Sequence, residues 1–277
     1  MDFFQASMTE ADYQRFSELV YKVAGIHLHE GKRELLQARV GKIIRRRNLR
    51  SFRQYFDMVI NDNSGNELTE LLNAVSTNLT YFFREEKHFQ FLREKWLPQF
   101  LETTSSSTKL RGWSAGCSTG EETYSILITL LEALGTDTRL DIKILGSDLS
   151  TRVLNVAARG TYPAERVETI PAALKQKYFR KVNSNGEYHY TVKPILSDHI
   201  LFRRINLMEP FPFRNPLNFI FCRNVMIYFD KITQENLIRK FHDALGPNGY
   251  LFIGHSESLS GIKHSFKYVS PAIYRKA

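Results

Sequence analysis

Residues 110–134 read LRGWSAGCSTGEETYSILITLLEAL, and this stretch decides the fold. A segment of strand length, residues 110–114, leads into a glycine-containing turn, and an apolar segment of helical length, residues 124–134, follows the turn. A strand, a turn and a helix in this order form the repeating unit of an α/β sheet with parallel strands. The stretch therefore predicts an α/β domain that begins near residue 110.

The same alternation continues toward the end of the chain. Further strands are predicted at residues 141–148, 200–205, 218–222 and 249–253. A helix is expected to begin at Ser150 and another to cover residues 234–245, while residues 266–275 are expected to close the sheet as a hairpin. The pattern predicts a doubly wound, Rossmann-like sheet.

One segment breaks the alternation. Residues 179–182 and 187–192 are rich in β-forming side chains, and the polar turn 183–186 separates them, so they predict an antiparallel hairpin. The hairpin stands where a crossover helix is expected. We therefore interpret residues 162–196 as a small antiparallel β insertion in the sheet domain.

The chain before the sheet is predicted to be helical. A capping sequence at Thr9 and a glycine at position 25 bound a first helix. Further helices are predicted at residues 32–48, 52–60, 67–75 and 85–101. We expect an all-helical N-terminal domain over residues 1–75 and a second domain over residues 76–277, which contains the insertion.

Composition excludes several classes of protein. Of 277 residues, 43% are hydrophobic and 24% are charged, which is unlike a disordered, collagen-like or disulfide-stapled chain. The two cysteines, Cys117 and Cys222, are expected to be buried free thiols. Neither a signal peptide nor an apolar run of membrane-spanning length is visible, so we expect a cytoplasmic, soluble protein without membrane insertion.

The net charge of +9 is concentrated in one segment. Residues 32–53 contain nine basic residues and one acidic residue, which accounts for +8 of the total. On a helical wheel one face carries basic side chains, namely Arg39, Lys42, Arg45 and Arg46. The buried stripe is expected to consist of Leu36, Val40, Ile43 and Ile44. A basic face of this kind is usually solvated, but such a concentration also suits an acidic partner.

The glycine-containing turn, residues 114–122, is a candidate cofactor site. Glycines such as Gly116 let a ligand approach the backbone, and the following helix offers free amides. Glu121 and Glu122 follow the turn directly and would repel a pyrophosphate. A cationic, hydroxylated cofactor is favoured instead, which points to S-adenosylmethionine. At least one of the two acids, Glu121 by preference, is explained by the helix dipole alone.

Polar side chains follow three of the other strands at the end where α/β sheets bind ligands. They are Asp148, Asn206 with Leu207, and Arg223 with Asn224. Asp148 would accept the ribose hydroxyls, and Asn206 with Leu207 would flank the adenine ring. Structural alternatives remain open: a helix cap for Asp148, a strand end for Asn206 and a network of loop contacts for Arg223.

Residues 76–85, which join the helical part to the sheet, mix hydroxyls, an amide and an arginine with three aromatic side chains. Asn78 or Thr80 would suit a helix cap, but a cap does not account for Arg84. Four motifs now resemble the CheR family of bacterial chemotaxis receptor methyltransferases. They are residues 78–85 (NLTYFFRE), 114–122 (SAGCSTGEE), 222–230 (CRNVMIYFD) and 254–257 (GHSE). The resemblance covers nearly the whole chain, and four long motifs in order are highly specific.

The resemblance implies an S-adenosylmethionine-dependent enzyme that esterifies glutamate side chains on the helical cytoplasmic domain of chemoreceptors, leaving S-adenosylhomocysteine. The implied cofactor site consists of Asn78, Thr80, Arg84, Gly116, Glu122, Asp148, Asn206, Leu207, Arg223 and Asn224. Arg84 and Tyr228 would lie closest to the transferred methyl group, although Tyr228 also suits a core aromatic. In some family members the β insertion binds a receptor C-terminal pentapeptide, and that partner is an open option for this insertion.

The implied reaction makes modest demands on the protein. A glutamate side chain titrates near pH ~4.3 and is already ionised at neutral pH, so no general base is required. We find no catalytic dyad and expect no metal. The basic face of Arg39, Lys42, Arg45 and Arg46 would bind the acidic receptor helices, and we expect a monomer that does not bind nucleic acid.

Two other functions compete with this interpretation. A nucleic-acid-binding protein would use the basic residues 32–53 in a groove, with a steep salt dependence. A nicotinamide dehydrogenase on the same fold is disfavoured by the acids at positions 121 and 122. Binding of S-adenosylmethionine distinguishes the methyltransferase from both.

Overall fold

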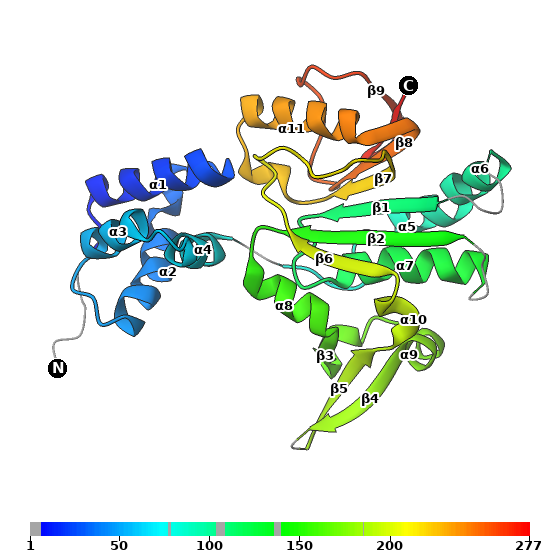
Figure 1. Ribbon diagram of the computed structural model, residues 1–277, viewed down its shortest axis with the longest axis horizontal. Coiled ribbons are helices and arrows are strands. Elements are labelled where there is room, and N and C mark those ends of the chain that lie inside the picture. Colours follow the sequence, from blue (N-terminus) through cyan, green and yellow to red (C-terminus); the bar gives the residue numbers. More distant parts are fainter. Residues whose placement is uncertain (1–6, 77–78, 104–108, 136–139, 185) are drawn as a thin grey trace.

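The computed structural model describes residues 7–76, 79–103, 109–135, 140–184 and 186–277. Figure 1 shows a group of N-terminal helices beside a mixed sheet with helices around it, and a small second sheet below. Within the described residues no helix combines the length and the apolar character that crossing a membrane requires.

Residues 7–76 form four α-helices and a short 3₁₀ turn. They are α1 (Glu10–Ala24), η1 (Glu30–Lys32), α2 (Arg33–Arg46), α3 (Phe52–Asn61) and α4 (Asn66–Val75). Phe16, Val40, Ile44, Tyr55 and Leu71 are fully buried among them, so the helices have a core of their own. The helices expected from the sequence are confirmed to within two residues at nearly every boundary.

The ends of α1 follow from local chemistry. The Thr9 hydroxyl accepts a hydrogen bond from the Asp12 backbone, and the Asp12 carboxylate accepts one from the Thr9 backbone, which forms a capping box. Gly25 ends the helix in the left-handed conformation, at φ 69°. A side chain there would be strained, and its Cβ would lie 2.4 Å from the Met208 sulfur. The sequence signals at Thr9 and Gly25 therefore had a direct physical meaning.

The helix expected over residues 85–101 is broken into three segments. They are α5 (Lys87–Phe91), a π-helical turn labelled η2 (Leu92–Trp96), and α6 (Leu97–Glu102). The expected start was wrong by two residues because Glu85, like Phe83, has a left-handed backbone, with φ of 58° and 57°. The wider turn precedes Pro98, which has no N–H to continue the regular ladder.

The main sheet has seven strands in the order β6-β2-β1-β7-β8-β10-β9. They are β1 (Lys109–Ala115), β2 (Asp141–Asp148), β6 (Ile200–Arg204), β7 (Leu217–Cys222), β8 (Leu245–Ile253), β9 (Phe266–Ser270) and β10 (Ile273–Lys276). The first five in the sheet order are parallel, and β10 pairs antiparallel with both β8 and β9. The predicted alternation and the closing hairpin are confirmed.

Helices cover the main sheet on both faces. The helix α7 (Glu121–Leu134) shares one buried cluster with α5 and η2, whereas α11 (Lys231–Ala244) belongs to a second cluster with β7 and β8. The helix α8 (Thr151–Arg159) follows β2, and the Ser150 hydroxyl caps it. Cys117 and Cys222 are buried and free, as expected. This arrangement leaves the carboxyl ends of β1, β2 and β7 for a ligand.

The insertion is a separate antiparallel sheet of three strands, ordered β3-β5-β4. It contains β3 (Thr161–Pro163), η3 (Ala164–Val167), α9 (Ala172–Tyr178), β4 (Phe179–Ser184), β5 (Glu187–Val192) and α10 (Pro194–Ser197). The predicted hairpin is β4 and β5. The third strand, β3, was not predicted because three residues are too few to show a strand pattern.

Candidate functional site

A pocket lies where the strands of the main sheet end and the N-terminal helices approach them. It holds about 1040 Å³ of space, its open mouth included. The described lining residues come from separate parts of the chain: positions 24 and 26, 75 and 76, 79–84, Phe89, 116–122, 148–149, 205–207 and 223–229. The pocket brings together Thr80, Arg84, Gly116, Glu122, Asp148, Asn206, Leu207, Arg223, Asn224 and Tyr228. Asn78, the remaining predicted cofactor residue, lies outside the described residues.

The glycine-containing turn is folded tightly onto the end of β2. The N–H groups of Gly116 and Cys117 both donate to the Ser147 carbonyl at 2.8 Å. Gly116 has φ 79°, and a Cβ on it would lie 2.4 Å from a methyl group of Val225. The Ser118 N–H donates to the Asp148 carboxylate at 2.9 Å. The turn therefore presents bare backbone to the pocket, which suits close approach of a ligand.

The two acids at the start of α7 have different surroundings. Glu122 lines the pocket, where its carboxylate accepts hydrogen bonds from the Ser114 hydroxyl at 2.6 Å and from Arg223 at 3.1 Å. Glu121 is fully buried, and it accepts a hydrogen bond from the Thr119 hydroxyl at 2.7 Å. Burial raises the pKa of both carboxyls. The helix dipole is thus only part of the reason for Glu121, because a buried carboxylate needs partners of its own.

Asp148 and Asn206 are both engaged with backbone groups. Asp148 also accepts a hydrogen bond from the Ser150 N–H at 2.9 Å, and burial raises the pKa of its carboxyl. The Asn206 amide donates to the Val23 carbonyl of α1 at 2.7 Å, so it joins the N-terminal helices to the pocket. The cap residue of α8 is Ser150, not Asp148. Carboxylate oxygens accept more than one hydrogen bond, so Asp148 keeps capacity for a ligand hydroxyl.

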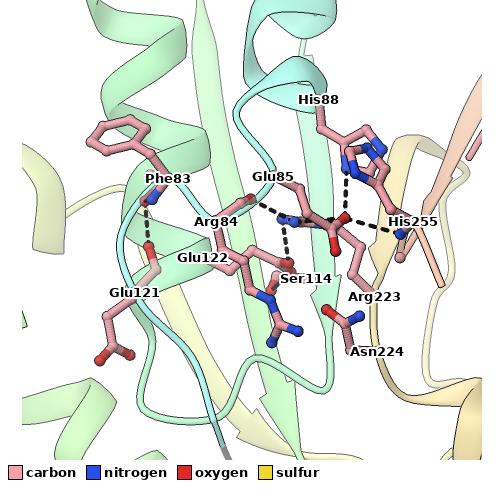
Figure 2. Close-up of polar contacts among 12 residues, drawn as sticks. Phe83, Arg84, Glu85, His88, Ser114, Glu121, Glu122, Arg223, Asn224 and His255 are labelled. Carbon is pink, nitrogen blue, oxygen red and sulfur yellow. Dashed lines mark hydrogen bonds and ion pairs between the residues drawn. The ribbon is translucent and has the colours of Figure 1, made fainter. Parts of the chain in front are cut away.

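Arg223 connects the linker at residues 79–86 to α7. Its guanidinium lies 3.0 Å from the Glu85 carboxylate and 3.1 Å from the Glu122 carboxylate, and it donates to the Arg84 carbonyl at 2.5 Å. Figure 2 shows Arg223 between these two acids. Only 2% of the side chain is exposed. Arg223 therefore forms the network of loop contacts that the sequence left open as an alternative. The same contacts hold Glu122 and the backbone of Arg84 at the pocket.

Glu257 is a residue whose role sequence reasoning missed. Its carboxylate accepts hydrogen bonds from the backbone N–H groups of Asn224, Val225, Met226, Ile227 and Gly254, at 2.6 to 3.3 Å. These bonds hold the segment that carries Arg223 and Asn224, and Asn224 has a left-handed φ of 58°. The signal was the motif at residues 254–257, to which we assigned no function.

Arg84 and Tyr228 both lie at the pocket, half-buried. Arg84 donates to the Leu79 carbonyl at 2.9 Å, and its guanidinium carbon lies 5.9 Å from the centre of the Tyr81 ring. Its side chain leaves the backbone in a different direction from that of Glu85 (Figure 2). Tyr228 belongs to a short 3₁₀ turn, η4 (Met226–Tyr228), and its carbonyl accepts a hydrogen bond from the His27 N–H at 2.8 Å. Among the described residues the Tyr228 hydroxyl has no hydrogen-bond partner.

The basic residues of α2 divide into two groups. Arg39 donates to the carbonyls of Ala74, Val75 and Ser76 at 2.7 to 3.1 Å, which satisfies the end of α4 beside the pocket. Its guanidinium is committed inside the protein, so Arg39 does not belong to a free basic face. Lys42, Arg45 and Arg46 are exposed, and Arg46 forms an ion pair with Glu70.

Glu85, His88 and His255 place three potential metal-ligand atoms within 4.8 Å of one another (Figure 2). Glu85 already pairs with Arg223, whose positive charge opposes a cation at this place. His88 is fully buried, and neither of its ring nitrogens has a hydrogen-bond partner among the residues that the structure describes. Burial, and then Arg223, lowers the pKa of His88 to about 3, so the ring is neutral. The expectation that the reaction needs no metal stays a prediction.

Comparisons with known proteins agree with this geometry. Residues 78–274 match the family model described as "CheR methyltransferase, SAM binding domain", and residues 11–76 match "CheR methyltransferase, all-alpha domain". The "Chemotaxis protein methyltransferase" of Borreliella burgdorferi is 40% identical over 274 residues, 98% of this chain and 95% of the relative. "Chemotaxis protein methyltransferase 2" of Pseudomonas aeruginosa is 40% identical, over 97% of this chain and 94% of the relative.

A third relative, the "Chemotaxis protein methyltransferase" of Salmonella typhimurium, is 37% identical over 97% of this chain and 91% of its own length. The family models together cover nearly all of the described chain, and the relatives are matched over almost their full length. The chain therefore belongs to the CheR methyltransferase family and is an S-adenosylmethionine-dependent methyltransferase.

Proposed function

We propose that the protein transfers the methyl group of S-adenosylmethionine to glutamate side chains on the helical cytoplasmic domain of chemoreceptors, which gives glutamate methyl esters in sensory adaptation. The observation that carries the proposal is one pocket that is lined by two carboxylates, Glu122 and Asp148, and by a cationic side chain, Arg84. The pocket lies in a chain whose relatives are chemotaxis protein methyltransferases.

The residues present fit this cofactor. Glu122 and Asp148 suit a ligand that carries a positive charge and hydroxyl groups, and Gly116 exposes backbone at the pocket in a conformation that a side chain would strain. The other pocket-lining residues proposed to contact the cofactor are Asn206, Leu207, Thr80 and Asn224. When bound, the cofactor supplies a methyl group on a sulfonium, which is an electrophilic carbon with a neutral thioether as leaving group.

The chain's own residues then have three tasks. Arg84 would bind and orient the incoming glutamate carboxylate, because a guanidinium donates to a carboxylate in a fork. Tyr228 would donate a hydrogen bond from its hydroxyl at the same place. The pocket walls would align the carboxylate oxygen with the methyl carbon and exclude water. A carbon–oxygen bond forms, the carbon–sulfur bond breaks with its electron pair staying on sulfur, and no proton moves.

We further propose the division of labour between the parts of the chain. Residues 1–75 would present Lys42, Arg45 and Arg46 to the acidic receptor helices, and residues 76–277 would carry out methyl transfer as a monomer in the cytoplasm. Arg46 pairs with Glu70, and Arg47 pairs with Glu67 and Glu70, so the charge available to a nucleic acid is smaller than the sequence total. The same ion pairs lower the charge offered to acidic receptor helices, so the choice of a receptor as the partner rests on the chemotaxis methyltransferase relatives.

The decisive experiment incubates the protein with S-adenosylmethionine labelled in its methyl group and a receptor cytoplasmic fragment. We expect label on the fragment that is released as methanol by mild base, which identifies an ester. The matched control is the same fragment with its glutamates replaced by alanine, which should take up no label. Label that resists base, or label on the control, would contradict glutamate esterification.

The affinity for S-adenosylmethionine should fall as the pH is lowered. Burial raises the pKa of Glu122 above 4.5 and that of Asp148 above 3.8, so these groups take up protons at a higher pH than exposed carboxyls do. Protonation removes the negative charge that attracts a cationic ligand. Calorimetric titrations between about pH 8 and about pH 5 test this. Glu122→Gln should flatten the profile, Glu86→Gln on the surface should not, and an affinity that rises in acid would contradict the assignment.

Reversing two exposed charges on α2 should slow receptor methylation selectively. In Lys42→Glu/Arg45→Glu the attraction for acidic helices becomes repulsion, and we expect about a tenfold loss in kcat/KM for the receptor fragment at low salt. S-adenosylmethionine binding should stay unchanged. Lys263→Glu/Lys267→Glu changes two exposed lysines, one before β9 and one in it, and is the matched control because β9 lies away from α2 (Figure 1). Unchanged methylation at low salt would exclude α2 as the receptor contact.

A further inference from the structure

Arg166 connects the β insertion to the cofactor pocket. It belongs to η3 in the insertion and does not line the pocket itself. Its guanidinium donates to the Thr80 carbonyl at 3.1 Å and to the Thr119 hydroxyl at 3.1 Å, and it lies 3.2 Å from the Glu121 carboxylate. One side chain thus reaches three places on two separate segments outside the insertion.

Each of these contacts falls on a segment that shapes the pocket. Thr80 lines the pocket as part of the linker between the helical part and the sheet. Thr119 belongs to the glycine-containing turn, and Glu121 opens α7 directly before Glu122. A guanidinium is planar and carries several donors in fixed directions, so it can hold two segments at a set distance from each other.

The helix dipole alone does not explain why Glu121 is an acid, and its pairing with Arg166 supplies the rest of the reason. Glu121 is fully buried, and a buried carboxylate is costly without a cationic partner. The Thr119 hydroxyl donates to one of its oxygens and Arg166 lies beside the other. Arg166, Thr119 and Glu121 therefore form one connected polar group at the turn.

Aromatic contacts from the insertion act on the same two segments. The Tyr162 hydroxyl donates to the Thr119 carbonyl at 2.6 Å. The ring of Phe82, two residues after Thr80, packs edge-on against Tyr162 at 5.2 Å and Phe179 at 5.6 Å between ring centres. Two independent sets of contacts thus join the insertion to the linker and to the turn.

We propose that Arg166 is a positioning residue for the cofactor site: it holds the linker at Thr80 against the glycine-containing turn at Thr119 and so sets the width of the pocket for S-adenosylmethionine. The insertion is then part of the cofactor site as well as an appended module. The inference rests on the cofactor pocket of the proposed function, but it is independent of which protein is methylated.

The test measures S-adenosylmethionine binding by calorimetry, with no receptor present, in four variants. Arg166→Ala should weaken binding about tenfold, the loss that follows when charge-assisted hydrogen bonds no longer hold a wall of the site. Arg166→Lys should lie between this variant and the unaltered protein, because an ammonium keeps the charge near Glu121 but cannot donate as a fork. Arg180→Ala, an exposed arginine of the same insertion, is the matched control and should bind normally.

The double variant Glu121→Gln/Arg166→Ala separates positioning from stability. Without the carboxylate no uncompensated buried charge remains, so its melting temperature should return toward that of the unaltered protein. Its cofactor affinity should stay low because Thr80 and Thr119 are still unconnected. Binding within twofold of normal in either Arg166→Ala or the double variant would overturn the proposal.

Kinetics with a receptor fragment give a separate readout. Arg166→Ala should raise KM for S-adenosylmethionine and leave kcat at saturating cofactor nearly unchanged, whereas loss of a catalytic group would lower kcat. If no receptor fragment is methylated even by the unaltered protein, the proposed substrate is wrong, and the binding measurements still decide the role of Arg166.

Discussion

Replacing Arg84 by alanine is expected to lower the rate of methyl transfer about 100-fold while the fold survives. The Arg84 side chain is half-buried at the pocket, and within the part of the chain that the structure describes its guanidinium makes one hydrogen bond, to the Leu79 carbonyl. Its other donors are available to a substrate carboxylate, and a hydrogen bond between charged groups is worth about 1.5–3 kcal/mol. Loss of orientation in the transition state adds to this, because the reaction depends on alignment rather than on a base.

The measurement is single-turnover transfer of a labelled methyl group, with thermal unfolding as the check on the fold. Arg93→Ala, an exposed arginine of η2 that pairs with Glu94, is the matched control and should be fully active. Arg84→Lys should recover only part of the rate, since an ammonium lacks the fork geometry. Near-normal turnover in Arg84→Ala would remove Arg84 from the mechanism.

Replacing Arg223 by methionine is expected to lower both the stability of the fold and the affinity for S-adenosylmethionine. The side chain is almost fully buried between Glu85 and Glu122, and it also holds the Arg84 carbonyl. Removing one partner from a buried ion pair leaves an uncompensated charge, which costs about 3–5 kcal/mol. Cofactor affinity should fall as well, because Glu122 and the linker both lose a contact that places them.

Chemical denaturation gives the free energy of unfolding, and calorimetry gives the cofactor affinity. Arg239→Met, on the exposed side of α11, is the control and should change neither quantity. Adding Glu122→Gln to Arg223→Met should restore part of the stability, since one of the two unpaired acids is removed. Unfolding free energies that match between Arg223→Met and the unaltered protein would show that Arg223 is not the connection described.

Local signals predicted most of the secondary structure. The capping box at Thr9, the glycine at position 25 and the apolar strands each act within a few residues, so the sequence alone reports them. Several starts were wrong: the helix expected over residues 85–101 begins two residues late, the helices expected at 124–134 and 234–245 begin three residues early, and the strand expected at 249–253 begins four residues early. In the first of these, the expected first residue, Glu85, has a left-handed backbone, and its carboxylate pairs with Arg223, a partner that lies 138 positions away.

The site residues also fall into those that local sequence signals could identify and those that depend on distant partners. Residues that follow strands, such as Asp148 and Asn224, could be named because parallel strands end at a common edge. Arg39 was assigned to a receptor-facing surface because a helical wheel shows which residues share a side. The wheel does not show that the end of α4 lies beside Arg39 with three carbonyls to satisfy. Glu257 and Arg166 were missed because their partners lie far away in the sequence.

The sequence by itself determined the order of strands and helices, the family, and the motifs from which the pocket is built. Those are encoded in periodicity and in runs of adjacent residues. The tertiary structure alone decided which partners the charged side chains have: Arg223 lies between two acids, Arg39 at the end of α4, and the partly exposed Arg166 beside Glu121. The physical reason is that the cost of burying a charge depends on the groups within a few ångströms, and the fold brings those groups together from distant parts of the chain.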